Sequence, residues 1–132
     1  MSNVKVLHIR VASREYVKRR TIEIATGTKP LQPGEPKLYV SSFDSLAKIL
    51  TERNMLLLEM IRNSQPQSVA DLARLSKRAK SNLSRTLHSM EKLGIVELKE
   101  RAGRKVPTTK YDKVKVECTI GGTTDAELRK TG

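Results

Sequence analysis

The order of the segments between residues 52 and 118 constrains the fold of this chain more than any other feature. Apolar residues recur there at helical spacing in three successive stretches. These stretches are residues 52–63, 69–76 and 80–93. Pro66 and the basic turn 77–79 separate them, and residues 95–100 then alternate between apolar and polar side chains, as a strand does. Three helices followed by a hairpin predict a winged helix-turn-helix.

The predicted hairpin has a basic turn, RAGRK at 101–105, in which Gly103 allows a tight reversal. We expect the second strand to begin near Val106 and to run through 113–118, where valines alternate with lysines. Pro107 should mark an irregular start of that strand, because proline cannot donate to a ladder of hydrogen bonds.

The third predicted helix has one apolar side and one polar, cationic side. At about 100° per residue, Leu83, Leu87 and Met90 share a narrow sector, which should face the core. The opposite sector has no acidic residue before Glu91. Its side chains are Ser81, Arg85, His88 and Lys92, flanked by Asn82 and Ser84. These are the residue types that bind base edges and phosphates in duplex DNA, so this helix is predicted to enter the major groove.

The candidate DNA-binding residues lie on this helix, on the segment before it and on the hairpin turn. Asn82 and Arg85 are expected to read bases, because Asn pairs with adenine and Arg with guanine. Lys77 and Lys80 are expected to bind phosphate, whereas His88 is equally consistent with a DNA contact and with a plain surface histidine. The hairpin turn is expected to reach the adjacent minor groove or its phosphates. The full set is Ser68, Lys77, Arg78, Lys80, Ser81, Asn82, Ser84, Arg85, His88, Arg101, Arg104 and Lys105.

The N-terminal part predicts a small α/β segment. Residues 4–11 are rich in β-branched side chains and should form a strand. Ser13 can then cap a helix that runs to about Thr26, although residues 21–25 are also consistent with a strand. Residues 27–36 contain three prolines and two glycines, which indicates a linker.

These predictions divide the chain into three parts, and the predicted fold class is α+β, mainly α. Residues 1–36 form the N-terminal segment with its linker, and residues 37–118 form the winged helix-turn-helix domain. Residues 119–132 have few apolar groups, so we expect them to be a disordered tail.

The charge of the chain favours a polyanionic partner. Lys and Arg number 26 against 14 Asp and Glu, and residues 62–110 alone hold 12 basic and 4 acidic side chains. Charge does not by itself distinguish duplex DNA from RNA or an acidic membrane surface. The chain has four aromatic residues, none of them in a stacking motif, which weakens the case for RNA. No apolar run approaches the roughly 20 residues of a membrane span and no signal peptide is recognisable, so a cytoplasmic location is expected.

Cofactor chemistry and catalysis have little support in the sequence. Cys118 is the single cysteine, and His8 and His88 lie far apart without partners at metal-ligand spacing. We find no Ser/His/Asp grouping, no paired carboxylates and no phosphate-binding loop. We therefore expect no metal, no cofactor and no enzymatic activity.

Four pieces of the sequence together resemble an archaeal and bacterial family of MarR-like winged-helix proteins. They are DLA at 71–73, KSNLSRTLHSMEKLGIVEL at 80–98, FDSLAKIL at 43–50 and the valine-rich strand that ends near Glu117. The resemblance covers about residues 37–118. It implies a DNA-binding transcriptional regulator, commonly dimeric and in some members antitoxin-like, and it supplies no known ligand.

Three functions remain open from the sequence. The first is a sequence-specific regulator that binds double-stranded DNA as a homodimer. The second is an antitoxin that autoregulates its operon and binds a toxin protein, and the third is a non-specific nucleoid or plasmid-maintenance protein. The apolar groups that the winged helix-turn-helix does not use are the candidates for a dimer interface. They are Val4, Val6, Ile9, Leu46 and Ile49.

Overall fold

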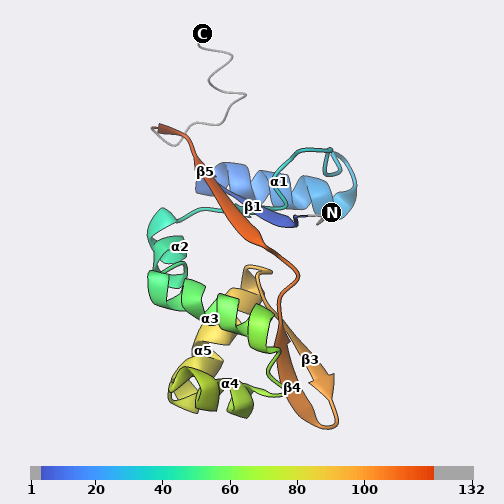
Figure 1. The fold of residues 1–132 in the computed structure, drawn as a ribbon. Coiled ribbons are helices and arrows are strands. Elements are labelled where there is room, and N and C mark those ends of the chain that lie inside the picture. The colour runs from blue at the N-terminus through green and yellow to red at the C-terminus, as the bar shows by residue number, and fades with distance from the viewer. Residues whose placement is uncertain (1–3, 121–132) are drawn as a thin grey trace. The chain divides into compact units, whose positions relative to one another are not determined.

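The computed structural model describes residues 4–120, which contain five helices and five strands (Figure 1). The chain forms two compact units. One comprises residues 47–111 and is called here the helix–hairpin unit, and the described residues on both sides of it, 4–46 and 112–120, form the sheet unit. The helix–hairpin unit is therefore an insertion in the sequence of the sheet unit. These boundaries differ from those expected from the sequence.

The sheet unit is built on three parallel strands in the order β2-β1-β5. They are β1 (Val6–Val11), β2 (Leu38–Val40) and β5 (Lys113–Cys118). The central strand β1 has the most buried side chains, because Leu7 is 2% and Ile9 is 0% exposed. Parallel strands need a crossover connection, and the helix α1 (Arg14–Thr26) supplies the one between β1 and β2.

The capping residues of α1 are those predicted from the sequence. The Ser13 Oγ accepts a hydrogen bond from the Tyr16 N–H at 3.2 Å. Gly27 ends the helix in the left-handed region, with φ of 75°, which favours glycine. The prediction of a helix is confirmed, and the alternative of a strand at 21–25 is wrong.

The helix–hairpin unit has the element order expected of a winged helix-turn-helix. Its elements are α3 (Glu52–Ser64), α4 (Val69–Ser76), α5 (Lys80–Lys92), β3 (Glu97–Arg101) and β4 (Arg104–Thr108). The short helix α2 (Phe43–Ile49) precedes them and contains the boundary between the two units. Leu83, Leu87 and Met90 are each 0% exposed, so the apolar sector of α5 faces the core as predicted.

The hairpin turn consists of Ala102 and Gly103, whose φ angles are 51° and 74°. Two positive φ values in a two-residue loop match the type I′ turn, whose twist fits a β-hairpin. As a result Arg101 and Arg104, the residues that flank the turn, lie directly opposite each other.

The predicted second strand of the hairpin is divided in the structure, and its second half belongs to the other unit. β4 ends at Thr108, whereas residues 113–118 form β5 in parallel with β1. The Thr109 Oγ1 donates to the Ile95 carbonyl at 2.7 Å. The Asp112 N–H then donates to the Lys5 carbonyl at 2.7 Å, which places the following residues beside β1. The prediction of one continuous strand was wrong because it ignored the unpaired edge of β1.

Pro107 also differs from its predicted position. It lies within β4 opposite Leu98 and is fully buried, so it does not mark an irregular start. The hairpin has two strands, so one side of β4 faces no ladder partner, and a proline is tolerated on such an edge.

The expected dimer interface is only partly available. Ile9 is 0% and Leu46 is 3% exposed, so both are core residues, whereas Val4 and Val6 are exposed. The expectation of a disordered tail falls almost wholly on residues 121–132, which lie outside the described residues. No helix in the range 4–120 is long and apolar enough to cross a membrane.

Candidate nucleic-acid interface

The turn between α4 and α5 sets the position of the predicted reading helix. Lys77 caps α4 in the left-handed region, with φ of 58°. The Arg78 N–H donates to the Ala73 carbonyl at 3.2 Å, and α5 begins two residues later at Lys80. The N-cap residue of α5 is Ala79, whose side chain cannot accept a hydrogen bond. It therefore does not cap the first backbone N–H groups of this helix.

The polar side of α5 forms an exposed ridge opposite the core. Ser81, Arg85, His88 and Lys92 are all exposed, as their sector predicts. The flanking residues differ, because Asn82 is exposed whereas Ser84 is partly buried. The structure thus brings five of the predicted DNA-binding residues, together with Lys92, onto a single helix side or its flanks.

One flank of the ridge borders a cleft that we call the wing cleft, with a volume of about 570 Å³. Its lining residues are Ser68, Val69, Ala70, Lys80, Ser84, Gly103, Arg104 and Lys105. Three of them are cations and none is a carboxylate. This cleft lies between the hairpin turn on one side and the start of α4 with the first turns of α5 on the other.

Ser68, a predicted contact, has a structural role at this cleft. Its Oγ accepts the Asp71 N–H at 3.0 Å and so caps α4, and the residue is 9% exposed. The Asp71 Oδ2 in turn accepts the Gln67 N–H at 3.0 Å, which holds the pKa of this carboxyl below its usual value. Only a small part of Ser68 is left for a ligand.

The other flank of the ridge borders the arginine cleft, with a volume of about 540 Å³. Its lining residues are Thr51, Arg53, Asn54, Arg78, Ala79, Asn82, Arg85 and Thr86. Three are arginines and none is a carboxylate. At about 100° per residue, Asn82 and Thr86 lie nearly opposite Lys80 and Ser84 around α5, so the two clefts flank the ridge from its two sides.

Arg78 was predicted as a surface contact but is partly buried in the arginine cleft. Its Nη2 donates to the Asn54 Oδ1 at 3.0 Å. Burial, and then the nearby charge of Arg53, lower its pKa from the ordinary value. This guanidinium is therefore oriented by Asn54, and no carboxylate between residues 4 and 120 forms an ion pair with it.

Arg53 and Asn54 belong to the site and were missed in the sequence. They lie in α3, outside the helix-turn-helix pair, so a search confined to that pair does not reach them. One signal was available, because Arg53 follows the cap Thr51 within the first turn of a predicted helix. The helix dipole disfavours a cation near the N-terminus, so an arginine at that position indicates a role other than stabilising the helix.

Three further predicted residues, His88, Lys77 and Arg101, are exposed to solvent. The His88 side chain is 58% exposed, and its Nδ1 lies 3.8 Å from the Glu91 Oε1. Arg101 stands opposite Arg104, and like charges that face each other across a hairpin destabilise it unless an anion is near.

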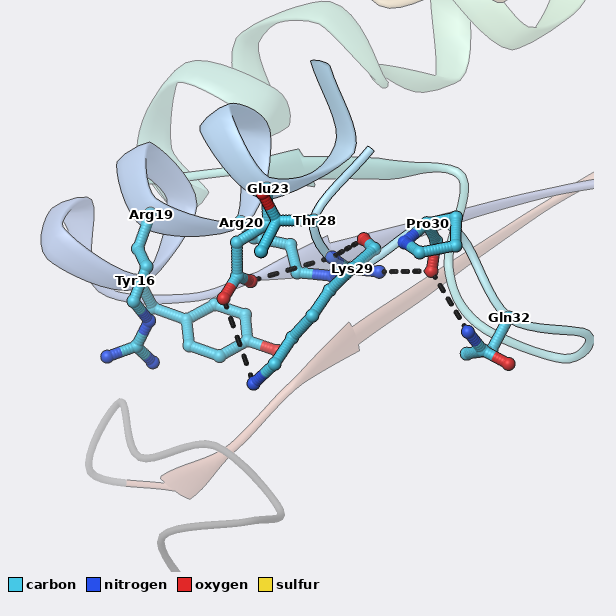
Figure 2. Close-up of a pocket in the computed structure, with 8 residues that line it drawn as sticks. All are labelled: Tyr16, Arg19, Arg20, Glu23, Thr28, Lys29, Pro30 and Gln32. Atoms are coloured by element: carbon cyan, nitrogen blue, oxygen red, sulfur yellow. Dashed lines mark hydrogen bonds and ion pairs between the residues drawn. The ribbon is translucent and has the colours of Figure 1, made fainter. Parts of the chain in front are cut away.

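A third pocket lies in the sheet unit and has a different character (Figure 2). Its volume is about 640 Å³, and Tyr16, Arg19, Arg20, Glu23, Thr28, Lys29, Pro30 and Gln32 line it. Arg20 is 7% exposed, and its Nε and Nη2 donate to the two Glu35 oxygens at 2.5 and 2.6 Å. Its Nη1 donates to the Lys29 carbonyl at 2.6 Å. The segment 27–36, predicted to be a linker, is thus fixed to α1.

The charges at Arg20 are balanced within the protein. The Arg20 guanidinium lowers the pKa of Glu35 from 4.5 to about 2, and the Glu35 carboxylate raises the pKa of Arg20. The Tyr39 hydroxyl donates to the Glu35 Oε2 at 2.7 Å, and burial followed by this carboxylate raises the pKa of Tyr39. We therefore interpret this pocket as a structural ion pair. Among the described residues, no three His, Cys, Asp or Glu side chains group as metal ligands would.

A family comparison covers the region that contains both clefts. The model of the family HVO_A0114 matches residues 49–116, which is just over half of the chain. The chain belongs to the HVO_A0114 family. All lining residues of the wing cleft and the arginine cleft fall inside this HVO_A0114 region, whereas α1, β1 and β2 fall outside it. The family match does not test the resemblance to MarR-like proteins, which stays a prediction.

Two solved structures are weakly similar to this HVO_A0114 chain. One is a predicted DNA-binding transcriptional regulator from E. coli, with a TM-score of 0.45 and 21% identity, covering 67% of this chain and 87% of that chain. The other is NolR from Sinorhizobium fredii, with a TM-score of 0.45 and 20% identity, covering 76% of this chain and 80% of that chain. Both likenesses are too weak to assign a function. The search of curated proteins found no match.

Proposed function

We propose that this protein is a sequence-specific transcriptional regulator that binds double-stranded DNA by inserting α5 into the major groove. The observation that carries the proposal is the pair of cationic clefts on the two flanks of the exposed α5 ridge. Each cleft has three cations and no carboxylate in its lining.

The dimensions of DNA support this arrangement. The major groove is roughly 12 Å wide and has a phosphate backbone along each edge, and an α-helix with its side chains is roughly 10–12 Å across. A helix in the groove therefore has one row of phosphates on each flank. Cations on both flanks, with a polar ridge between them, complement that pattern of charge.

Within this proposal the ridge and its flanks have separate roles. Asn82 and Arg85 read base edges, and Ser81 and Ser84 support them. Lys77 and Lys80 bind phosphate and fix the register. His88 lies on the same ridge, where it contacts a base or a phosphate. The hairpin residues reach the neighbouring minor groove or its phosphates. They are Arg101, Arg104 and Lys105.

A competition experiment tests sequence specificity. The full chain is titrated by fluorescence anisotropy into a labelled duplex from the promoter of its own gene, with a scrambled duplex of equal length as competitor. A specific regulator should prefer the promoter by at least roughly 10³-fold at physiological salt. Equal affinity for both duplexes would indicate a non-specific nucleoid-type protein instead, and no binding to either would reject DNA as the partner.

The salt dependence tests the role of the wing cleft. Lys80→Gln should weaken binding to both duplexes alike and reduce the slope of log affinity against log salt by about one, because one phosphate contact is lost. Lys18→Gln removes an equal charge from an exposed position on α1 and is the matched control. The same slope for both variants would exclude Lys80 as a phosphate ligand.

We further propose that the protein acts as a homodimer that reads two half-sites about one helical turn apart. In support, β5 is an edge strand, and among residues 4–120 no strand pairs with its outer side. Antiparallel pairing of two β5 strands centred on Val116 would place Lys115 opposite Glu117 of the second copy, twice, and would bring the exposed valines together.

Sedimentation equilibrium tests the dimer. The wild-type chain should be dimeric at micromolar concentration, and Val116→Lys should be monomeric, because it places two lysines opposite each other at the centre of the pair. A wild-type chain that stays monomeric at high micromolar concentration would reject the homodimer.

A further inference from the structure

We infer that the arginine cleft is a phosphate-binding site in which Arg53 and Arg78 hold one phosphate group beside the base-reading ridge of α5. The inference rests on the proposed function in one respect, because the cleft's place next to α5 makes the DNA backbone the expected source of the phosphate. The experiments below separate that source from a free phosphate or nucleotide.

Asn54 fixes the geometry of the cleft. Its backbone N–H donates to the Thr51 Oγ1 at 3.1 Å, and its Nδ2 donates to the Ile49 carbonyl at 2.8 Å. Because the Nδ2 donates to Ile49, the orientation of the side-chain amide is fixed. Its Oδ1 accepts a hydrogen bond from the Arg78 Nη2 at 3.0 Å. The guanidinium of Arg78 is therefore oriented through one N–H, and its other donors have no hydrogen-bond partner among the described residues.

The positive charge of the arginine cleft is not balanced by a carboxylate of the described residues. In the part of the chain from residue 4 to residue 120, no ion pair joins a carboxylate to Arg53, Arg78 or Arg85. The three arginines nevertheless line a single cleft. Crowding of like charges opposes folding, and a partly buried cation without a partner adds a desolvation cost. A bound dianion or phosphodiester would remove both costs.

The donors suit phosphate better than a single carboxylate. Guanidinium groups bind phosphate through parallel N–H···O bonds, and phosphate has enough oxygens to accept from two arginines together. Thr51, Asn82 and Thr86 add neutral polar groups around the arginines. With about 540 Å³, the cleft has room for a phosphate with the sugars attached to it.

Binding measurements with Arg53→Gln test the inference on DNA. This variant should bind the promoter duplex and the scrambled duplex more weakly by the same factor, roughly three- to tenfold, and should lower the salt slope by about one. Arg62→Gln, which removes an equal charge from the last turn of the same helix, should bind within twofold of wild type. Arg53→Gln should melt no lower than wild type, because it removes a cation from the first turn of α3.

A second measurement uses inorganic phosphate alone. The arginine Nε–Hε resonances of the full-length protein are followed by NMR during titration with sodium phosphate, and sodium chloride at equal ionic strength is the control. The signals of Arg53 and Arg78 should shift with phosphate and not with chloride. In Arg53→Gln, the Arg78 signal should no longer respond.

The outcomes distinguish the two proposals. If the duplex binds wild type while Arg53→Gln behaves as Arg62→Gln does, the phosphate site is rejected and the DNA-binding function stands. If no duplex binds while inorganic phosphate shifts the arginine signals, the function is rejected, and the cleft takes a free phosphate or a nucleotide. If neither ligand has an effect, both proposals are wrong.

Discussion

Arg20 is buried and Arg78 is partly buried, and the surroundings of their charges differ. Both oxygens of Glu35 and two backbone carbonyls accept hydrogen bonds from Arg20. Among the residues that the structure describes, Arg78 has one neutral acceptor, the Asn54 Oδ1, and another arginine lies nearby. The environment accordingly raises the pKa of Arg20 and lowers that of Arg78. We therefore interpret Arg20 as a structural residue, and we propose that Arg78 binds a ligand.

The same contrast extends to the two units. Residues 47–111 hold 14 basic and 6 acidic side chains, and the rest of the chain holds 12 and 8. The excess is therefore concentrated in the unit that contains both cationic clefts. A concentrated field of this kind attracts polyanions and speeds their association. Measurements of stability and of DNA binding can test whether balanced and unbalanced arginines differ in this way.

The largest effect is expected from Arg20→Ala. It leaves the Glu35 carboxylate, whose side chain is 14% exposed, without its partner, and loss of one member of a buried ion pair costs up to about 3–5 kcal/mol. Arg78→Ala is the comparison, because it removes one hydrogen bond to a neutral acceptor but also relieves the repulsion from Arg53, so it should cost at most about 1 kcal/mol. Urea unfolding followed by circular dichroism measures both. Equal losses of stability would remove the distinction between the two arginines.

The pH dependence of stability follows from the same ion pair. The pKa of Glu35 falls from 4.5 to about 2 on folding, so the unfolded chain binds the proton more tightly. The stabilisation is complete above the unfolded pKa and is lost as the pH falls from 4.5 toward 2. It amounts to roughly 3 kcal/mol. Urea unfolding of wild type and Glu35→Gln should show a steeper loss in wild type across this range. Parallel curves would contradict the assigned shift.

A smaller and more selective effect is expected from Arg85→Ala. Loss of a bidentate contact with guanine should cost about 1–3 kcal/mol at the specific site and should relax the preference at one base pair. Arg53→Gln is the control, since a phosphate contact should affect all sequences alike. Anisotropy titrations with single-base variants of the promoter measure the difference. An equal loss on specific and scrambled duplexes would make Arg85 a phosphate ligand as well.

The helices could be predicted because local signals determine them. Ser13 and Gly27 bound α1, and the spacing of Leu83, Leu87 and Met90 sets the buried side of α5. These signals lie within a few residues of the element that they specify. The exposed ridge of α5 followed directly from the same periodicity.

The features that escaped prediction depend on partners remote in the sequence. β5 pairs with β1 across more than a hundred residues, so its alternation alone could not show which sheet it joins. Arg20 meets Glu35 from a segment whose prolines and glycines suggest a linker. The arginine cleft combines the first turn of α3 with the turn before α5. Local periodicity contains no information on such contacts.

The smallest effect is expected at the hairpin turn, where Arg101 and Arg104 oppose each other. Arg101→Gln removes this repulsion and should stabilise the protein by a few tenths of a kcal/mol at low salt, although it removes a cation proposed to contact DNA. Glu100→Gln is the matched control, because Glu100 faces Lys105 across the same hairpin and its removal should destabilise by a similar amount. Thermal unfolding at low and high salt should show opposite shifts that both shrink as salt rises, and DNA binding should weaken only for Arg101→Gln. If both variants lose stability, Arg101 and Arg104 do not repel each other in the free protein. The distinction between balanced and unbalanced cations would then not apply to the hairpin.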